Sequence, residues 1–553
     1  MSHICTHCSA NFDIPEDERA FLASMDVSPP KQCPHCRFVR RLNERNARNL
    51  YKRKCGLTGR DFISPYSDVP FPVYHPDEWI TDKWDETKYG MEIDWNKPFF
   101  DQMEVLFNSV PRQGQFICPG TLENSEYVNC AGYLKDCYLL AETDYNEKCM
   151  YGNRVFHNQY VVDCSNIYDS ELCYECIDCN KCHSCRYCQD CENCSDSFFL
   201  RNCMGCRDCI GCMNQRQKQY MIFNEQLTKD TYEKRKEELQ LHRHAGVEEM
   251  RKKSAEFFLT QPHRYVQMEH SQNSTGDHLY NSKNATQCID GKDLEDCKYC
   301  ARVFSVKTAL DYTSWGDRSE RIYSTASSGD NAYHLRFCTT CTTNISDLTY
   351  CGHCTGCKNC FGCVGMKKRQ YCILNTQYTK EEYEALLLRV IEHMKKTGEW
   401  GEFFPWRFCC FGYNETIAQE YFPLTKEQAL AKGYKWKDTR DEKLIVEKVI
   451  PAEKLPQTIA EVPDDILQWA VTCGLSKRPF KIIKQELEFY RQLNIPLPHL
   501  HPDERHNRRM TLRPSRIFYQ RNCAKCGKEI QTTYAPDRPE IVYCESCYLE
   551  TVY

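Results

Sequence analysis

The chain has 553 residues, of which 41% are hydrophobic, and its 72 Lys and Arg against 77 Asp and Glu give a net charge of −5. This balance excludes a uniformly basic nucleic-acid coat, though not local basic patches, and the apolar content excludes a disordered chain. No apolar run is long enough to span a membrane, and the first residues do not resemble a signal peptide. We therefore expect a cytoplasmic protein.

Forty of the residues are cysteine. A cytoplasmic chain does not normally hold the many disulfides that forty cysteines would allow. We therefore expect most of these thiols to be metal ligands or small buried groups.

Residues 1–78 are predicted to contain two small zinc-ribbon modules, which we call A and B. In module A, two C-x2-C knuckles separated by 24 residues supply Cys5, Cys8, Cys33 and Cys36. Two such knuckles can close a tetrahedral Zn²⁺ site and leave no open position for catalysis. Modules this small bury little core, so metal binding would supply much of their folding energy.

Module B is an altered copy. It keeps Cys55, but Thr58, His75 and Glu78 stand at the other ligand positions. One interpretation is a Cys/His/Glu metal site with an open position. The other is a metal-free remnant whose polar groups hydrogen-bond to one another.

A basic stretch follows module A. Positively charged side chains recur there every three or four residues, namely Arg37, Arg41, Arg45, Arg48 and Lys52. In a helix leaving the second knuckle they would share a face. Two interpretations stay open: contact with nucleic-acid phosphates, which arginine suits, and a solvated face paired with acidic groups of the chain.

Residues 79–115 are predicted to be a linker with a helix, and 116–226 a cysteine-rich repeat. From Cys173 to Cys194 a cysteine stands at every third position, often after Asp or Asn. A period of three fits neither a helix nor a strand, whereas Asp and Asn favour left-handed turn positions. We expect a narrow β-solenoid-like coil with one inward residue on each short side.

Four roles stay open for the inward thiols. They could pack as small hydrophobic groups, form a row of zinc sites, ligate Fe–S clusters, or form disulfides. Fe–S ligation is disfavoured, because the C-x2-C-x2-C runs lack the C-x3-C-P continuation of ferredoxins.

A helical connector at 227–262 leads to the second repeat, 263–378. The second repeat matches the first at an offset of 151, so that Cys203, Cys206, Cys209 and Cys212 match Cys354, Cys357, Cys360 and Cys363.

Residues 379–470 are predicted to be a helix and a connector. Thr379 and Glu382 form a capping box before an apolar stripe, and Gly398 is a plausible stop. Thr425 and Gln428 cap a second, short helix.

Residues 471–553 repeat the first 78 at an offset of 468, as modules A′ and B′. Module A′ is altered like module B and carries Cys473, Ser476, His501 and Glu504; both altered modules read His-Pro-Asp-Glu where the second knuckle would be. Module B′ is intact, with Cys523, Cys526, Cys544 and Cys547. This end has its own phosphate-contact candidates, Arg505, Arg508 and Arg509.

The run Phe12, Glu18, Phe21, Pro29–Pro30 and Cys33–Arg37 resembles the small zinc-ribbon (treble-clef-like) domain of many bacterial proteins. Together with the tail from Cys523 to Cys547 and the Cys-Phe-Gly-Cys-Val-Gly run at 360–365, it resembles large Cys-rich zinc-ribbon proteins of candidate-phyla-radiation bacteria. Some of these carry a CaiB/BaiF label, but no residue here supports a CoA-transferase. The resemblance implies zinc binding and no established activity.

The overall prediction is a mainly β protein with connecting helices, in which a duplicated, Cys-lined, β-solenoid-like core is flanked by paired zinc-ribbon modules. We expect at least two Zn²⁺ and no catalytic residues, since no phosphate loop, nucleophile elbow or His-Glu-x-x-His is present. The first functional hypothesis is a non-enzymatic scaffold that contacts RNA or a ribonucleoprotein through its arginine-rich helices. The alternatives are a protein-assembly scaffold that uses the solenoid faces, and a metal or redox thiol protein.

Overall fold

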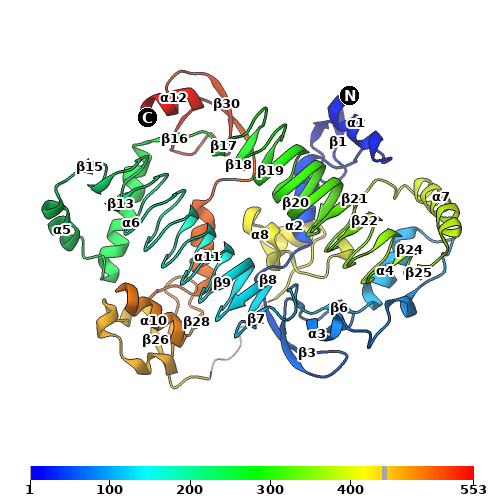
Figure 1. Ribbon diagram of the computed structural model, residues 1–553, viewed down its shortest axis with the longest axis horizontal. Coiled ribbons are helices and arrows are strands. Elements are labelled where there is room, and N and C mark those ends of the chain that lie inside the picture. Colours follow the sequence, from blue (N-terminus) through cyan, green and yellow to red (C-terminus); the bar gives the residue numbers. More distant parts are fainter. Residues whose placement is uncertain (1, 439–444, 553) are drawn as a thin grey trace. The chain divides into compact units, whose positions relative to one another are not determined.

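The computed structural model describes residues 2–438 and 445–552 (Figure 1). Its contacts divide the chain into two compact units. Unit 1 combines residues 1–114, 266–437 and 516–518, and unit 2 combines residues 115–265, 438–515 and 519–553. Each unit therefore joins one central repeat to the pair of modules from the more distant end of the chain.

The fold is mixed, since helices as well as strands make up much of each unit. In unit 1, modules A and B contain β1 (Ser2–Ile4), β2 (Asn11–Asp13), α1 (Glu16–Ser24), α2 (Pro34–Asn43), β3 (Tyr51–Lys54), β4 (Asp61–Ser64), β5 (Val73–Tyr74) and α3 (Pro76–Trp79). They are followed by α4 (Phe99–Ser109) and β6 (Arg112–Gln113), and later in the chain by α7 (Lys380–Thr397), α8 (Ile417–Tyr421) and α9 (Lys426–Ala431).

The middle of unit 1 is a series of parallel strands that we call the second ladder, residues 268–373. It consists of β17 (Met268–Glu269), β18 (Gly276–Tyr280), β19 (Cys288–Lys298), β20 (Ala301–Ala326), β21 (Ala332–Arg336), β22 (Ile345–Thr349), β23 (Lys358–Phe361) and β24 (Gln370–Ile373). The antiparallel strand β25 (Thr376–Gln377) closes its end.

Unit 2 holds the first ladder, residues 122–222. Its strands are β7 (Leu122–Glu123), β8 (Val128–Lys135), β9 (Leu140–Glu147), β10 (Asn153–Phe156), β11 (Ser165–Tyr168), β12 (Ile177–Asn180), β13 (Arg207–Ile210) and β14 (Gln219–Ile222), closed by β15 (Glu225–Gln226). After it come α5 (Lys229–Glu238), α6 (His244–Leu259) and β16 (Pro262–Arg264).

The C-terminal modules complete unit 2. Module A′ and the segment before it contain β26 (Lys448–Pro451), β27 (Trp469–Thr472), β28 (Pro479–Phe480), α10 (Lys484–Leu493) and α11 (Pro502–Leu512). Module B′ contains β29 (Tyr519–Asn522), β30 (Glu529–Thr532), β31 (Ile541–Tyr543) and α12 (Glu545–Val552).

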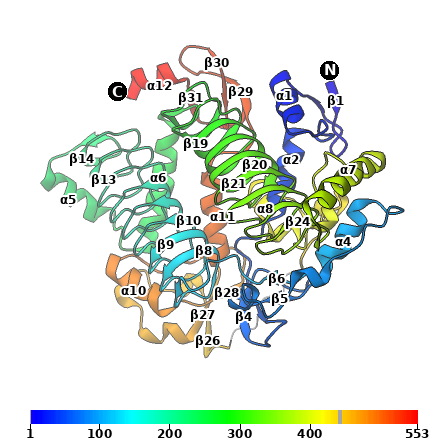
Figure 2. The same cartoon turned by 45° about the vertical axis from the view of Figure 1, so that its right-hand side comes forward.

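Neighbouring strands within each ladder are successive in the chain and run side by side in parallel (Figure 2). In the first ladder the paired residues are 12 positions apart, as Ser165 and Ile177 are. The second ladder has the same step at Ser346 and Lys358, but three successive steps, from Gly316 to Gly329, Thr342 and Thr355, are 13 residues long. These longer steps insert three residues into the second ladder.

The period of three has a backbone cause. Along the first ladder, every third residue has a positive φ, and it is the residue that precedes the cysteine position. Asp136, Asp163, Asp178 and Asn193 all lie there, with φ between 51° and 55°. The prediction that Asp and Asn before Cys mark left-handed turn positions is confirmed, because their short polar side chains tolerate this conformation better than most.

The predicted helix caps are also present. Thr379 and Glu382 form the capping box of α7, and Gly398 ends that helix with φ 75°. Thr425 and Gln428 cap α9 in the same way. The apolar stripe of α7 is buried at Tyr383, Val390, Ile391 and Met394.

The arginine-rich helix is shorter than the spacing suggested. Helix α2 ends at Asn43, and Lys52 lies in β3. Beyond the end of α2, the Asn46 side chain accepts a hydrogen bond from the backbone N–H of Asn49 at 2.9 Å, which stabilises a turn there. The expectation of one continuous basic helix face from Arg37 to Lys52 is therefore wrong.

Candidate metal centre

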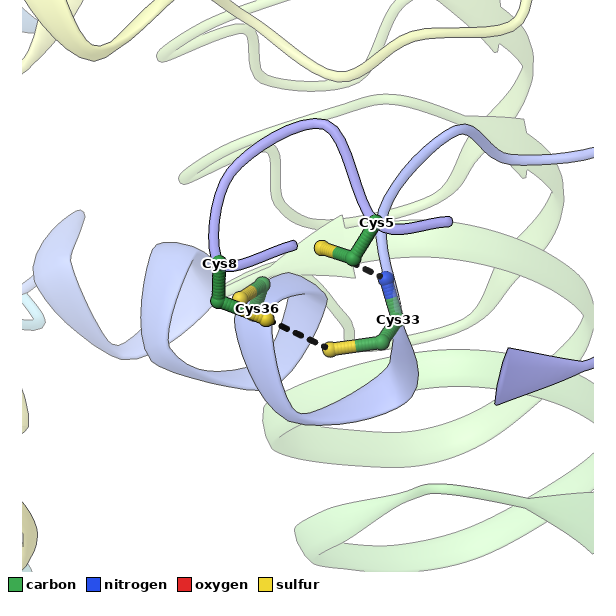
Figure 3. Close-up of side chains that lie close together, drawn as sticks. All are labelled: Cys5, Cys8, Cys33 and Cys36. Carbon is green, nitrogen blue, oxygen red and sulfur yellow. Dashed lines mark hydrogen bonds between the residues drawn. The ribbon is translucent and has the colours of Figure 1, made fainter. Parts of the chain in front are cut away.

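The four cysteines of module A converge on one point (Figure 3). Their sulfur atoms lie within 4.8 Å of one another, and the Cys8 and Cys33 sulfurs are 3.7 Å apart. Cys5 and Cys8 come from the turn between β1 and β2, while Cys33 and Cys36 come from the start of α2. Three of the four side chains are buried and Cys8 is exposed.

Module B′ builds the same arrangement. The sulfur atoms of Cys523, Cys526, Cys544 and Cys547 also lie within 4.8 Å of one another. The Cys526 and Cys544 sulfurs are 3.7 Å apart, and Cys526 is the exposed member. The two predicted tetrads are therefore both assembled.

The geometry of both tetrads fits a tetrahedral zinc site. Zn–S bonds of about 2.3 Å place the corners of a tetrahedron about 3.8 Å apart. This is close to the 3.7 Å between the Cys8 and Cys33 sulfurs and between the Cys526 and Cys544 sulfurs. Four soft thiolates with no water-binding position are typical of a structural zinc. Cys5, Cys8, Cys33 and Cys36 would hold one ion, and Cys523, Cys526, Cys544 and Cys547 a second.

Electrostatics within the first tetrad also suit a cation. Hydrogen bonds from the Cys36 thiol and the Cys36 backbone N–H, with smaller contributions from the Cys5 and Cys8 thiols, lower the pKa of Cys33 to about 4 despite burial. The same hydrogen bond between Cys36 and Cys33 raises the pKa of Cys36, because a second thiolate beside the first would be repelled. A divalent cation removes that repulsion, since metal binding lets all four thiols ionise.

All four modules fold the first knuckle in the same way. The N–H of its first cysteine donates to the carbonyl five residues later: Cys5 to Ala10, Cys55 to Arg60, Cys473 to Arg478 and Cys523 to Lys528, at 2.8–2.9 Å. The residue after the knuckle is left-handed in each, at Ser9, Gly59, Lys477 and Gly527. The knuckle fold is thus retained in modules B and A′, where three of the four cysteines are missing.

The histidines of the altered modules are helix caps. His75 stands at the N-cap of α3, where its Nδ1 accepts the N–H of Asp77 at 3.2 Å. His501 caps α11 in the same way through Asp503, at 3.1 Å. Side-chain acceptors at this position satisfy N–H groups that the first helical turn leaves unpaired.

The other ligand candidates of these modules do not assemble as the tetrads do. Within residues 2–438 and 445–552, neither Cys55, His75 and Glu78 nor Cys473, His501 and Glu504 form a group whose ligand atoms lie within 4.8 Å. Glu78 instead pairs with Lys83 at 2.6 Å. Burial alone would raise the pKa of Cys55, but hydrogen bonds from the Thr58 hydroxyl and from backbone N–H groups, including that of His75, outweigh it and lower the pKa.

Several candidate phosphate-binding arginines are used inside the units. In unit 1, Arg37 and Arg41 approach the two carboxylate oxygens of Asp311 at 2.7 and 2.9 Å, and Arg37 also contacts Glu18. In unit 2, Arg505 and Arg509 pair in the same way with Asp163. All four guanidinium groups are buried.

The remaining candidates, Arg508, Arg45 and Arg48, are not part of these four buried ion pairs. Arg508 pairs with Glu175 at 2.6 Å and is partly exposed. Arg45 and Arg48 follow the end of α2. RNA binding by these arginines stays a prediction, and the buried four already have carboxylate partners.

Sequence reasoning missed the acidic half of this contact. Helix α11 contacts the first ladder at Tyr151, Asp163 and Ser165. Helix α2 contacts the second ladder through equivalent hydrogen bonds and ring contacts at Tyr299, Asp311 and Thr313. The two sets are related by an offset of 148, not 151, because the three inserted residues of the second ladder come after Thr313. A search for the Tyr-x11-Asp-x-Ser/Thr pattern would have found both.

The ladder thiols are unbridged, and all of them except the half-buried Cys130 are buried. All forty cysteines lie among the described residues, and none of them is in a disulfide. Cys173 through Cys194 are at most 2% exposed. In the described part of the chain, no three ladder sulfurs form a group within 4.8 Å like those of the tetrads.

Each ladder thiol also serves the backbone. The Cys176 N–H donates to the sulfur of Cys164, one step earlier, at 3.2 Å, and the Cys164 thiol reaches the carbonyls of Val162 and Cys173. Where a serine replaces cysteine it does the same, as Ser170 accepts the N–H of Cys182 at 3.0 Å. The inward position therefore accommodates a side chain that both accepts and donates, although Val155, Ile167 and Leu200 occupy the same position and contribute apolar packing alone.

Comparisons with known proteins add no family. No family model and no curated protein matches the chain. One solved structure, described as a "putative acetyltransferase" from Desulfovibrio desulfuricans G20, is 9% identical and covers 48% of this chain and 71% of its own, with a TM-score of 0.10. A likeness this low carries no argument. In the described residues, no helix combines the length and apolarity needed to cross a membrane.

Proposed function

We propose that this protein is a non-enzymatic zinc-binding scaffold in which modules A and B′ each hold one structural Zn²⁺. The observation that carries the proposal is the pair of closed four-cysteine sites, one in each unit. Neither site keeps a position for water or substrate, so the metal would stabilise the module and would not activate a reactant.

The finer fold assignment belongs to this proposal. We infer that the ladders are β-solenoids, since their parallel pairing advances by one step of 11 to 13 residues at a time. Four left-handed residues in each 12-residue step would give four short sides. Such stacks are rigid and present regular faces, which suits a scaffold.

A protein partner is favoured over RNA as what the scaffold binds. The buried arginines of α2 and α11 already have partners, whereas the first ladder exposes a stack of rings formed by Tyr133, Tyr145 and His157. Tyrosine-rich surfaces are typical of protein interfaces. RNA binding would instead show the steep salt dependence of phosphate contacts.

The test is elemental analysis of anaerobically purified protein. We expect two Zn²⁺ per chain, falling to one when either Cys8→Ser or Cys526→Ser disrupts a tetrad. About four would mean that modules B and A′ bind metal as well, and iron in place of zinc would support the redox-protein alternative. Absence of metal from the purified chain would overturn the proposal.

A further inference from the structure

Helices α2 and α11 form a natural matched pair. They are related by the offset of 468, and each buries two arginines against one ladder aspartate. Each also has an intramodule glutamate, Glu18 or Glu486, 3.1 Å from the first arginine. The two docking contacts therefore have nearly the same chemistry.

The two helices differ in what holds their first turn. Helix α11 has His501 as its N-cap residue, whose side chain caps it, and it has Asp503 and Glu504 in the first turn. Helix α2 has Cys33 as its N-cap residue, with no side-chain cap and no acidic residue in the first turn. Cys33 and Cys36 belong to the tetrad, so a bound cation would tie this first turn to the knuckle of Cys5 and Cys8.

The docking arginines lie close to that junction. Arg37 follows Cys36 directly, and Arg41 is one helical turn further on, where its guanidinium is 1% exposed and paired with Asp311. Burying two guanidinium groups is favourable only while their geometry with the carboxylate is held. If the first turn of α2 loosens, the pair loses its alignment, and the charged groups gain more from water.

We propose that metal at Cys5, Cys8, Cys33 and Cys36 controls the docking of α2 on the second ladder, while the equivalent helix α11 stays docked without metal. This inference rests on the proposed zinc binding by module A. It makes unit 1 metal-responsive: loss of the ion releases α2 and uncovers the strip from Tyr299 to Thr313. In unit 2 the corresponding strip, from Tyr151 to Ser165, stays covered by a helix that His501 caps.

Hydrogen exchange measured by mass spectrometry tests this on the full chain, before and after zinc removal by a chelator under reducing conditions. We expect exchange to rise about tenfold or more in peptides covering Pro34–Asn43 and 299–313. Peptides covering Pro502–Leu512 and 151–165 should not change. Unchanged exchange in α2 after verified zinc loss, or equal loss of protection in α11, would overturn the inference.

A rescue variant gives a second test. The triple substitution C33H/H35D/C36E writes His-Pro-Asp-Glu, the sequence of modules B and A′, at the start of α2. This variant should bind one Zn²⁺ fewer yet keep α2 protected, whereas Cys8→Ser should lose both the metal and the protection. Equal loss of protection in both variants would contradict the capping argument.

Cys526→Ser is the matched control, because it removes the second tetrad and should leave α2 protected. The tests also separate this inference from the proposed function. A chain that binds no metal refutes both. A chain that binds two Zn²⁺ but whose α2 stays protected from exchange after their removal refutes only the inference.

Discussion

At the residue scale, the ladder cysteine is best understood as a backbone partner. The Cys176 N–H is buried and donates to the sulfur of Cys164. Burial raises the pKa of Cys164 well above its usual value, which keeps the thiol protonated and able to donate in turn. Size and hydrogen bonding together therefore explain why a serine can replace cysteine at single ladder positions such as Ser170.

This role predicts how Cys164 tolerates substitution. Cys164→Ser should be nearly neutral, because a hydroxyl also accepts and donates. Cys164→Ala should cost about 1–3 kcal/mol, because it leaves the Cys176 N–H without an acceptor. Urea unfolding followed by circular dichroism would measure the difference, and equal stability of the two variants would refute a hydrogen-bonding role.

Glu175 carries a pH dependence of stability. It lies between Arg251 and Arg508, at 2.9 and 2.6 Å, and is 6% exposed. Burial alone would raise its pKa, but the two arginines outweigh that effect and lower the pKa to about 2. A carboxyl group with a lowered folded pKa stabilises the fold above its unfolded pKa and loses that contribution as pH falls towards its folded pKa.

Glu175→Gln should therefore cost about 3 kcal/mol at pH 7, since each pKa unit is worth about 1.4 kcal/mol. The difference from the parent should shrink as pH falls from about 4.5 to 2. The urea midpoints of both proteins across this range measure it. A stability difference between the two proteins that stays constant down to the lowest pH would contradict the lowered pKa of Glu175.

At the scale of elements, the left-handed residue at every third position determines the three-residue period of the ladder. Lys181, with φ 51°, is exposed and occupies such a position. Lys181→Asn should be neutral or slightly stabilising, whereas Lys181→Val should cost about 1–2 kcal/mol, because a β-branched residue is strained at positive φ.

The control for this prediction is His183→Val, two positions further on, where the residue is exposed and its φ is not positive. Thermal unfolding of the three variants gives the comparison. If valine is tolerated equally well at both positions, backbone conformation does not set the period of three.

The modules show at the same scale that one knuckle fold occurs with and without a four-cysteine group. Modules A and B′ bring four sulfurs together, while modules B and A′ keep the knuckle turn and give the following helix a histidine cap. The sequence showed the parallel change of Cys-x2-Cys to His-Pro-Asp-Glu but left open whether it made a metal site or a remnant. The capping role of His75 and His501 appears only in the structure, where the Nδ1 atom of each lies at the start of a helix.

At the scale of the whole molecule, each unit joins distant parts of the chain. Arg509 and Asp163 are 346 residues apart, and Arg41 and Thr313 are 272 apart. Contacts this distant in sequence form late and slowly, because a long loop must close first. The N-terminal modules cannot dock until the second ladder has been made.

The sequence by itself determined the parts with a local cause. Cys-x2-Cys spacing predicted both tetrads, Asp and Asn before Cys predicted the left-handed positions, and Thr379 with Glu382 predicted the start of α7. Each depends on residues close in the chain or on a repeated pattern, so backbone preference and ligand chemistry suffice.

Only the tertiary structure decided what the arginines do. Their spacing was compatible with phosphate contact, with a solvated face and with internal pairing, because an arginine at a helix surface has the same sequence pattern in all three cases. Asp311 and Asp163 resolve the choice for Arg37, Arg41, Arg505 and Arg509 by burying them as ion pairs. Partners hundreds of residues away leave no local signal, and burial of a charge is settled by whichever carboxylate the fold brings to it.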